Sequence, residues 1–404
     1  MTAPRQHRMR VFLVGTEFFR SYGGIQYVNQ LLARAFCEMG SRTPLDIEAF
    51  SYMDGPEHFP AMAAADKPVR WHGAQRRRGE LAWRLAKRLA AAQPDLVLFT
   101  HVSLVPLEEV VHALAPGTRV AVLAHGTEVW QPLEGRVARA LPRVDAFVAP
   151  SAFTAQKLSD IHGIAPARVT VIPHGLSPDW NRESSASPPP RDPAEGRTGP
   201  LLLSVTRLSR ADCEGKGIDL VLQALPAVVA HCPRVRYRVV GGGGDLPRLA
   251  EVVRSLGLGG HTELPGARRQ DELQQAYREA YLFVLPTQVE GFGVVFLEAM
   301  HNRLPVVAVR ASATPEVVED GVTGVLVTPG RADELAGALI ALLSDADRRR
   351  AMGEAGRHRV EQMYRFEHFA ARWERWIAGQ VPEALYVARQ TSAFTAARAA
   401  VGAA

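Results

Sequence analysis

The sequence is short of cysteine and of long apolar runs, and both shortages limit what the protein can be. Its 404 residues hold three cysteines, Cys37, Cys213 and Cys232, too few and too scattered for a disulfide framework or a cysteine-based zinc site. We therefore expect a cytoplasmic protein. The apolar run after the basic N-terminus, VFLVG, is shorter than a secretory signal core, and no run approaches the roughly 20 residues that span a bilayer.

Clustered metal ligands are missing as well. One Asp-x-Asp, Asp345 to Asp347, has the form that metal-dependent transferases of another fold use, but it lies between ALLS and RRRAMGEAG. Acidic residues after Ser344 at that position are typical of a helix N-cap and first turn. We therefore interpret the pair as structural and expect neither a metal nor another cofactor.

What is present is the composition of an ordinary soluble protein, with 47% hydrophobic and 22% charged residues. The chain is too long for a single hydrophobic core, because cores stop growing near about 250 to 300 residues. The net charge of +5 suits an anionic ligand, a nucleic acid or a membrane surface and does not choose among them.

Short apolar runs alternate with amphipathic segments, which is typical of βα units around a parallel sheet. One series runs from MRVFLVG to VTVIP, and a second begins at LLLSVT. The sequence thus predicts an α/β protein of two doubly wound, Rossmann-like domains, at 1–182 and 200–365, joined by a linker at 183–199. Residues 366–404 are expected to form a helix and tail that pack back toward the first domain. Because ligands bind beyond the carboxyl ends of such strands, we expect the domains to face a central cleft.

The densest chemical signal is LPTQVEGFGVVFLEAM, which predicts a strand, a glycine-containing loop and a helix that begins near Gly293. Glycines permit close backbone approach, and amides at a helix start favour a phosphate or a sugar hydroxyl. Glu290 in the loop and Glu298 on the helix can reach the same ligand, because helical side chains lean toward the N-terminus. Paired carboxylates accept hydrogen bonds from vicinal hydroxyls, so ribose and hexose are the expected guests. The alternative is two solvated surface carboxylates.

Two cations follow the first strand of the second series. Arg207 comes after LLLSVT, and Lys216 precedes a helix expected to begin at Gly217. Preplaced cations can stabilise a departing nucleotide diphosphate without a metal. Either residue taken alone would be interpreted as an ordinary exposed side chain.

Other strand ends carry weaker signals. Gly23 and Gly24 precede a helix, where free amides can face an anion, although a structural turn is an equal alternative. His125 and His101 follow strands, but a lone histidine is more often structural. The run around Gly242 lacks the spacing of a dinucleotide-binding fingerprint and would equally serve a tight turn.

Together these motifs resemble glycosyltransferase family 4, whose members are retaining transferases with the two-domain GT-B fold, including those of bacterial exopolysaccharide assembly. The resemblance extends from FRSYGGIQYVNQLLARAF through AHGTEVW, VTRLSR and KGIDL to ATPEVVEDGVTGVLV. It implies a metal-independent hexosyltransferase that takes a UDP- or GDP-linked sugar and a glycan or lipid-linked acceptor in cell-surface polysaccharide or glycoconjugate synthesis. No nucleic-acid partner is expected.

The resemblance also implies residue roles. His125 would contact the donor sugar near the reacting carbon, Glu290 would hold the hexose, and Glu298 the ribose. Arg207 and Lys216 would bind the diphosphate, and the departing phosphate would help to deprotonate the acceptor hydroxyl in a same-face displacement. Other implied donor contacts are Gly24, Gly242, Phe292, Gly293 and Val294, and implied acceptor contacts are Gly23 and His101.

Two other functions fit the same fold. The protein would then be a non-catalytic nucleotide-sugar-binding scaffold of a polysaccharide assembly complex, or a phosphorylase or epimerase. A scaffold has no evident use for the complete set of site residues, which favours the transferase.

The segment RRRGELAWRLAKRLAAAQ raises the question of membrane contact. A basic amphipathic helix can lie on an anionic membrane, which would suit a lipid-linked acceptor at the inner face of the membrane. Its leucines Leu81, Leu85 and Leu89 nevertheless recur at core-facing spacing, and a packed helix with a solvated basic face is the commoner outcome.

Overall fold

The computed structural model describes residues 8–20, 23–42, 45–58, 69–180 and 199–380. The chain divides into two compact units, one formed within 1–149, 155–172 and 367–404 and the other by 150–154 and 173–366. The expected linker, apart from Gly199, and the tail beyond residue 380 lie outside the described residues.

The first unit is built on a parallel sheet in the order β3-β2-β1-β4-β5-β6-β7. Because β1 pairs with both β2 and β4, the strand order reverses at β1. Both faces of strands such as β4 and β6 are buried, so helices must cover both sides of the sheet. The strands are Met9–Gly15 (β1), Leu45–Ser51 (β2), Arg70–Gly73 (β3), Leu96–Phe99 (β4), Arg119–Leu123 (β5), Ala146–Ala149 (β6) and Val169–Val171 (β7).

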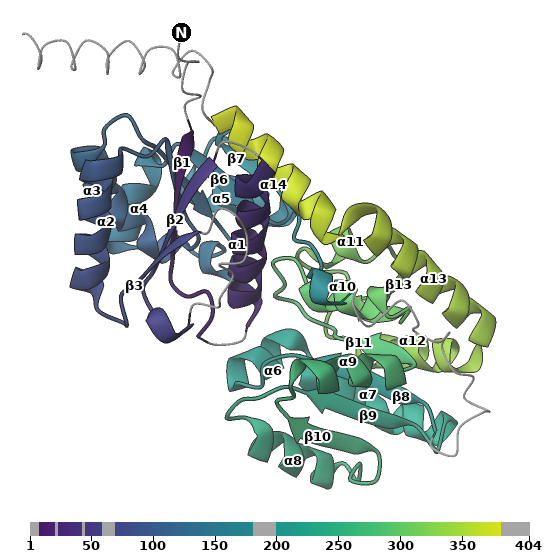
Figure 1. The fold of residues 1–404 in the computed structure, drawn as a ribbon. Helices are drawn as coiled ribbons and strands as arrows, with labels where there is room; N and C mark the ends of the chain where they lie inside the picture. Colours follow the sequence, from purple (N-terminus) through teal and green to yellow (C-terminus); the bar gives the residue numbers. More distant parts are fainter. Residues whose placement is uncertain (1–7, 21–22, 43–44, 59–68, 181–198, 381–404) are drawn as a thin grey trace, which may run out of the picture. The chain divides into compact units, whose positions relative to one another are not determined.

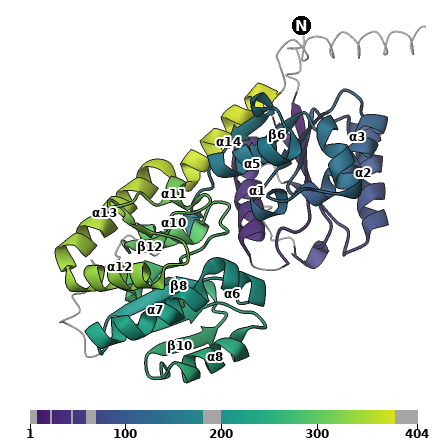
Figure 2. The same ribbon diagram turned by 180° about the vertical axis from the view of Figure 1, so that it is seen from behind.

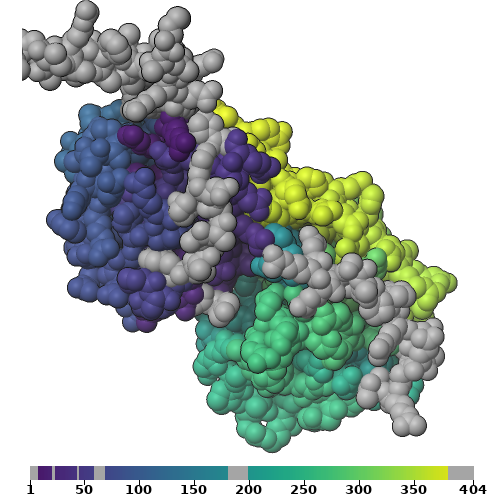
Figure 3. Space-filling model, viewed as in Figure 1, coloured from purple at the N-terminus to yellow at the C-terminus, as the bar shows by residue number. Residues whose placement is uncertain are grey.

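Helices occupy the two faces of this sheet in separate groups. The α-helices are Gly24–Arg42 (α1), Arg78–Ala92 (α2), Glu108–Leu114 (α3), Gly135–Ala140 (α4), Ala152–His162 (α5) and Phe366–Gln380 (α14), and the 3-10 turns are Pro56–His58, Val102–Leu107, Thr127–Val129, Leu141–Arg143 and Pro166–Arg168. Figures 1 and 2 show α2 and α3 on one face and α1 with α14 on the other. The ring of Phe36 in α1 lies 6.1 Å from that of Trp373 in α14, and Figure 3 shows the two helices in contact at the surface.

The second unit holds another parallel sheet, in the order β10-β9-β8-β11-β12-β13. Its order reverses at β8, which pairs with β9 and β11. The two doubly wound sheets confirm the predicted fold class. The strands are Leu201–Val205 (β8), Arg236–Val240 (β9), Thr262–Gly266 (β10), Leu282–Val284 (β11), Val306–Val309 (β12) and Gly324–Val327 (β13).

Helix pairs cover this sheet, with α7 packed on α12 and α10 on α13. The elements are Pro178–Trp180 (η7), Arg210–Lys216 (α6), Ile218–His231 (α7), Leu246–Ser255 (α8), Gln270–Glu279 (α9), Val294–His301 (α10), Thr314–Val317 (α11), Ala332–Ser344 (α12) and Ala346–Met363 (α13). Asp345 is the N-cap of α13 and accepts a hydrogen bond from the Arg348 amide at 2.9 Å. The Asp-x-Asp pair therefore has the structural place expected for it.

Candidate functional site

The loop between β11 and α10 places the predicted donor residues at a helix start. Gly293 is the N-cap of α10 with φ 93°, in the left-handed region that favours glycine. A Cβ there would lie 2.4 Å from the Phe296 ring, so glycine is also required sterically. Phe292 is buried and packs against His174 and Tyr364, with ring centroids at 5.1 Å and 5.8 Å. In the first turn of α10 the Phe296 amide donates to the Gly293 carbonyl at 2.9 Å, and the amides before it, at Val294 and Val295, are those that a helix start leaves without a carbonyl inside the helix.

Lys216 and Glu290 come from distant segments and meet in an ion pair. The Lys216 Nζ donates to Glu290 Oε2 at 2.7 Å and to the Val289 carbonyl at 3.1 Å. The two side chains are only 19% and 14% exposed. Lys216 ends α6, a helix that the sequence analysis did not predict. The helix expected to begin at Gly217 begins at Ile218, and Gly217, with φ 74°, separates α6 from α7.

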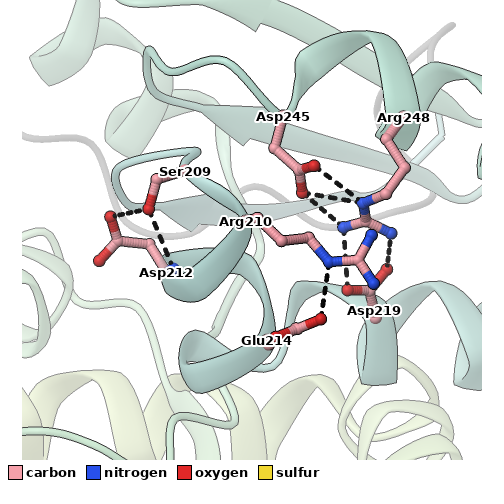
Figure 4. A network of polar contacts seen from close by, with 7 residues as sticks. All are labelled: Ser209, Arg210, Asp212, Glu214, Asp219, Asp245 and Arg248. Carbon is pink, nitrogen blue, oxygen red and sulfur yellow. Dashed lines mark hydrogen bonds and ion pairs between the residues drawn. The ribbon is translucent and has the colours of Figure 1, made fainter.

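Arg207 follows β8 and presents its side chain to solvent. Its guanidinium is 71% exposed and lies 3.2 Å from Asp212 Oδ1. Asp212 in turn accepts from the Ser209 hydroxyl at 2.6 Å, and Ser209 is the N-cap of α6. Figure 4 shows the Ser209–Asp212 contacts at its left, and through Asp212 the Arg207 side chain is tied to α6 without being buried.

The glycine turn after β9 is fastened to the same region. Arg248 binds Asp245, the α8 N-cap, and Asp219 in the first turn of α7, at 2.6 Å and 2.7 Å (Figure 4). The Gly242 carbonyl accepts from the Leu208 amide at 2.9 Å. Gly242 therefore lies in a tight turn that is hydrogen-bonded to Leu208, the residue that follows Arg207.

Glu298 lies on α10 and is buried, at 7% exposed. Burial raises the pKa of this carboxyl to about 7. The Tyr277 hydroxyl donates to its Oε2 at 2.7 Å. Sequence reasoning missed Tyr277, because nothing local links a helical tyrosine to a carboxylate on the following helix.

Ser312 is a second residue that the sequence did not single out. It lies after β12 with φ 48°, and its hydroxyl accepts a hydrogen bond from the Glu290 amide at 3.1 Å. The Ala313 amide donates to the Glu290 carbonyl at 3.2 Å. Farther along, Glu316 accepts from the Ala152 and Phe153 amides at 2.7 Å and 2.8 Å.

In the first unit, the two predicted histidines come together at the carboxyl ends of neighbouring strands. His101 follows β4, His125 follows β5, and their rings stack at 6.2 Å. The His125 Nε2 lies 2.7 Å from the Thr100 carbonyl. Because a carbonyl only accepts, Nε2 carries the hydrogen. Burial lowers the pKa of both histidines, so His125 is neutral at physiological pH.

Gly23 and Gly24 lie at the start of α1, after β1. The Gly23 carbonyl accepts from the Tyr27 amide at 2.9 Å, which begins the helical hydrogen-bond series. A Cβ on Gly24 would meet no atom within 4 Å. Packing among the described residues therefore does not explain glycine at this position.

The basic segment forms α2, and its leucine stripe faces the core as the spacing indicates. Leu81, Leu85 and Leu89 are buried against the sheet. Trp83 is 58% exposed, and the Lys87 Nζ lies 5.4 Å from the centre of its ring. None of the helices in the described ranges is both long and apolar enough to span a membrane. Within those ranges, no group of three or more histidine, cysteine or acidic side chains is arranged to hold a metal ion.

Comparisons with known proteins match nearly the whole chain. The family model described as Glycosyltransferase Family 4 matches residues 22–180, and that described as Glycosyl transferases group 1 matches residues 190–359. The chain is 30% identical to a GDP-mannose-dependent alpha-(1-6)-phosphatidylinositol monomannoside mannosyltransferase of Mycobacterium tuberculosis, over 92% of this chain and 98% of that protein.

Solved structures share the fold at lower identity. The lipopolysaccharide outer core galactosyltransferase WaaB superposes with a TM-score of 0.68 at 18% identity, over 92% of this chain and 100% of that one. Anabaena Alr3699/HepE in complex with UDP and glucose superposes with a TM-score of 0.69, also at 18% identity, over 92% and 100%. Both are similar to this chain in their GT-B fold.

Proposed function

Because the chain belongs to glycosyltransferase family 4, and so is a glycosyltransferase, we propose that it transfers a hexose with retained configuration, and without a metal, from a nucleotide diphosphate sugar to a lipid-linked or glycan acceptor. The observation that carries this proposal is the Lys216–Glu290 ion pair, which joins a cation at the end of α6 to a carboxylate in the loop between β11 and α10. The name of the mycobacterial relative makes GDP-mannose the first donor to test.

The second unit supplies the donor half of the proposed reaction. Lys216 and the exposed Arg207 stabilise the charge of the leaving diphosphate, taking the part that a metal plays in other enzymes. Glu290 accepts hydrogen bonds from the hexose hydroxyls, and the free amides at Gly293 and Val294 face the phosphates. Glu298 holds the ribose.

The first unit supplies the acceptor half. The His125 Nε2–H is bonded to the Thr100 carbonyl, so the ring is fixed and neutral. In this proposal His125 contacts the donor sugar near the reacting carbon. His101 and Gly23 contribute to acceptor binding, and the open space beside Gly24 admits the diphosphate. The acceptor oxygen attacks the anomeric carbon on the face that the diphosphate leaves, and its proton passes to the departing phosphate oxygen.

The test is release of nucleoside diphosphate by the purified full chain from GDP-mannose and UDP-glucose, with and without phosphatidylinositol monomannoside and in excess EDTA. We expect one donor to be consumed, acceptor to stimulate release, EDTA to have no effect, and the product's anomeric configuration by NMR to match the donor. Binding of the donor with no turnover would favour the scaffold. Phosphate-dependent formation of a sugar 1-phosphate would favour a phosphorylase.

We also propose that α2 contacts the inner face of an anionic membrane. Trp83 combines high exposure with an adjacent Lys87 ammonium, as expected of a side chain that enters the lipid headgroups. Trp83→Ala should weaken co-sedimentation with phosphatidylglycerol vesicles by about tenfold, because it removes a large apolar contact. Val322→Ala, which changes an exposed apolar residue of the second unit, serves as the control. Failure of the unaltered protein to co-sediment would contradict the proposal.

A further inference from the structure

The Glu298 carboxylate is held from the neighbouring helix α9. Tyr277 is fully buried, and its hydroxyl donates to Glu298 Oε2 at 2.7 Å. Among the described residues, Oε1 has no hydrogen-bond partner, yet it is not one of the fully enclosed unpaired atoms. One oxygen is therefore fixed by the protein, and the other retains access to a ligand.

The tyrosine itself has little freedom to move. Its ring stacks on Phe283 at 5.8 Å and 21°, and the edge of Trp180 meets it at 5.4 Å and 77°. Trp180 is 2% exposed and also lies 6.3 Å from the His301 ring, on the same helix as Glu298. The hydroxyl thus stands at a fixed point relative to α10.

We propose that Tyr277 is the positioning residue for nucleotide binding: its hydroxyl orients the Glu298 carboxylate so that Oε1 accepts hydrogen bonds from the ribose hydroxyls. The last torsion of a glutamate is broad and roughly two-fold, so a carboxylate without this hydrogen bond would sample orientations that do not face the ribose. The inference rests on the proposed function, in which Glu298 binds the ribose.

The same hydrogen bond affects when Glu298 is ionised. Burial raises the pKa of Glu298 to about 7, and the Tyr277 hydroxyl is the group that opposes this rise. His301, one turn farther along α10, is bonded to Arg357, and its pKa is lowered to about 4 by burial and that arginine, so it carries no charge at neutral pH. Among the described residues, Tyr277 is therefore the titratable side chain that contacts the Glu298 carboxyl.

The sign of the pH effect follows from these contacts. Ribose hydroxyls donate to the ionised carboxylate, so nucleotide affinity should fall as the pH drops through the pKa of Glu298. Tyr277→Phe removes the interaction that lowers this pKa. The loss of affinity should therefore begin at a higher pH in Tyr277→Phe than in the unaltered protein.

The experiment measures binding of GDP and UDP, and of their 2′,3′-dideoxy analogues, to the full chain by calorimetry between about pH 6 and about pH 9. The ratio of the two affinities reports contact with the ribose hydroxyls alone. We expect Tyr277→Phe to reduce the preference for the ribose form by about tenfold, since a hydrogen bond to a charged group is lost. Tyr237→Phe is the matched control, because Tyr237 is also fully buried and, among the residues that the structure describes, its hydroxyl bonds only to Ser204, at 2.8 Å.

A Tyr277→Phe protein with an unchanged ribose preference and an unchanged pH midpoint would overturn the inference while leaving the proposed function standing. Absence of GDP and UDP binding to the unaltered protein would instead remove the proposed function, and the inference with it. Glu298→Gln provides the second variant, because a carboxamide does not titrate. It should bind nucleotide with no midpoint near neutral pH, and a midpoint that persists would assign the titration to another group and overturn the inference.

Discussion

Replacing Glu290 by glutamine should lower kcat by about 10²- to 10³-fold, the loss typical of removing one group that acts on the transition state. The carboxamide keeps the shape of the side chain but accepts hydrogen bonds from hexose hydroxyls without a negative charge. It also releases Lys216 from its partner at 2.7 Å. The affinity for GDP or UDP alone should be unchanged or stronger, because a carboxylate is removed near the diphosphate and no cation is lost.

Turnover and nucleotide affinity must be measured on the same preparation to separate these effects. Glu214→Gln is the control, since Glu214 also forms an ion pair, with Arg210 at 2.6 Å, but at 57% exposure on α6. Turnover near the unaltered value in Glu290→Gln would remove Glu290 from the reaction. If nucleotide affinity falls together with turnover, the variant has disrupted the loop structure, and the loss of turnover cannot be assigned to a sugar contact.

Local chemistry made the donor loop predictable. The segment EGFGVVFLEAM carries a glycine at the N-cap and the good helix formers LEAM after the first turn, and α10 begins at Val294 as the pattern indicates. The helix α6 in the segment LSRADCEG was not predicted: Ser209 is its N-cap and accepts a hydrogen bond from the Asp212 amide. A serine followed three residues later by an acidic residue is a sequence signal for a helix N-terminus, and this signal is present at Ser209 and Asp212.

Partners distant in sequence were not predictable in this way. Lys216 and Glu290 are 74 positions apart, and Tyr277 and Glu298 are 21 apart. Periodicity assigns each residue to a strand end or a helix face, but it does not say which side chains face each other across a sheet edge. Ser312 illustrates the limit, because its role depends on a backbone bend at φ 48° and on a neighbouring loop.

The first unit shows how much one tertiary contact adds. From residues alone, His125 was a lone histidine with a structural interpretation as its strongest alternative. The Thr100 carbonyl fixes the tautomer, and the stack with His101 places both rings at one edge of the sheet. The structure supports their grouping, and their roles stay predictions until variants are assayed.

Lys216→Ala should lower kcat/KM by about 10³-fold, because a half-buried cation acts on the leaving diphosphate in both the ground state and the transition state. The Lys216 and Glu290 variants should differ in their effect on nucleotide affinity. Its loss should weaken binding of GDP or UDP together with turnover, whereas binding of GMP or UMP, which lack the outer phosphate, should change little. Lys216→Arg keeps the charge and should recover part of the nucleotide affinity.

The matched control for this variant is Arg210→Ala, which removes a cation of the same helix that is 60% exposed and bonded to Glu214. If general positive charge around α6 were responsible, Arg210→Ala would weaken nucleotide binding to a similar extent, and the effect of either variant would disappear as salt rises. If the placement of Lys216 beside Glu290 is what matters, only Lys216→Ala loses turnover, and the loss persists at high salt. Equal losses of GMP and GDP affinity in Lys216→Ala would contradict a diphosphate contact, because the lysine would then support the whole pocket and not the outer phosphate.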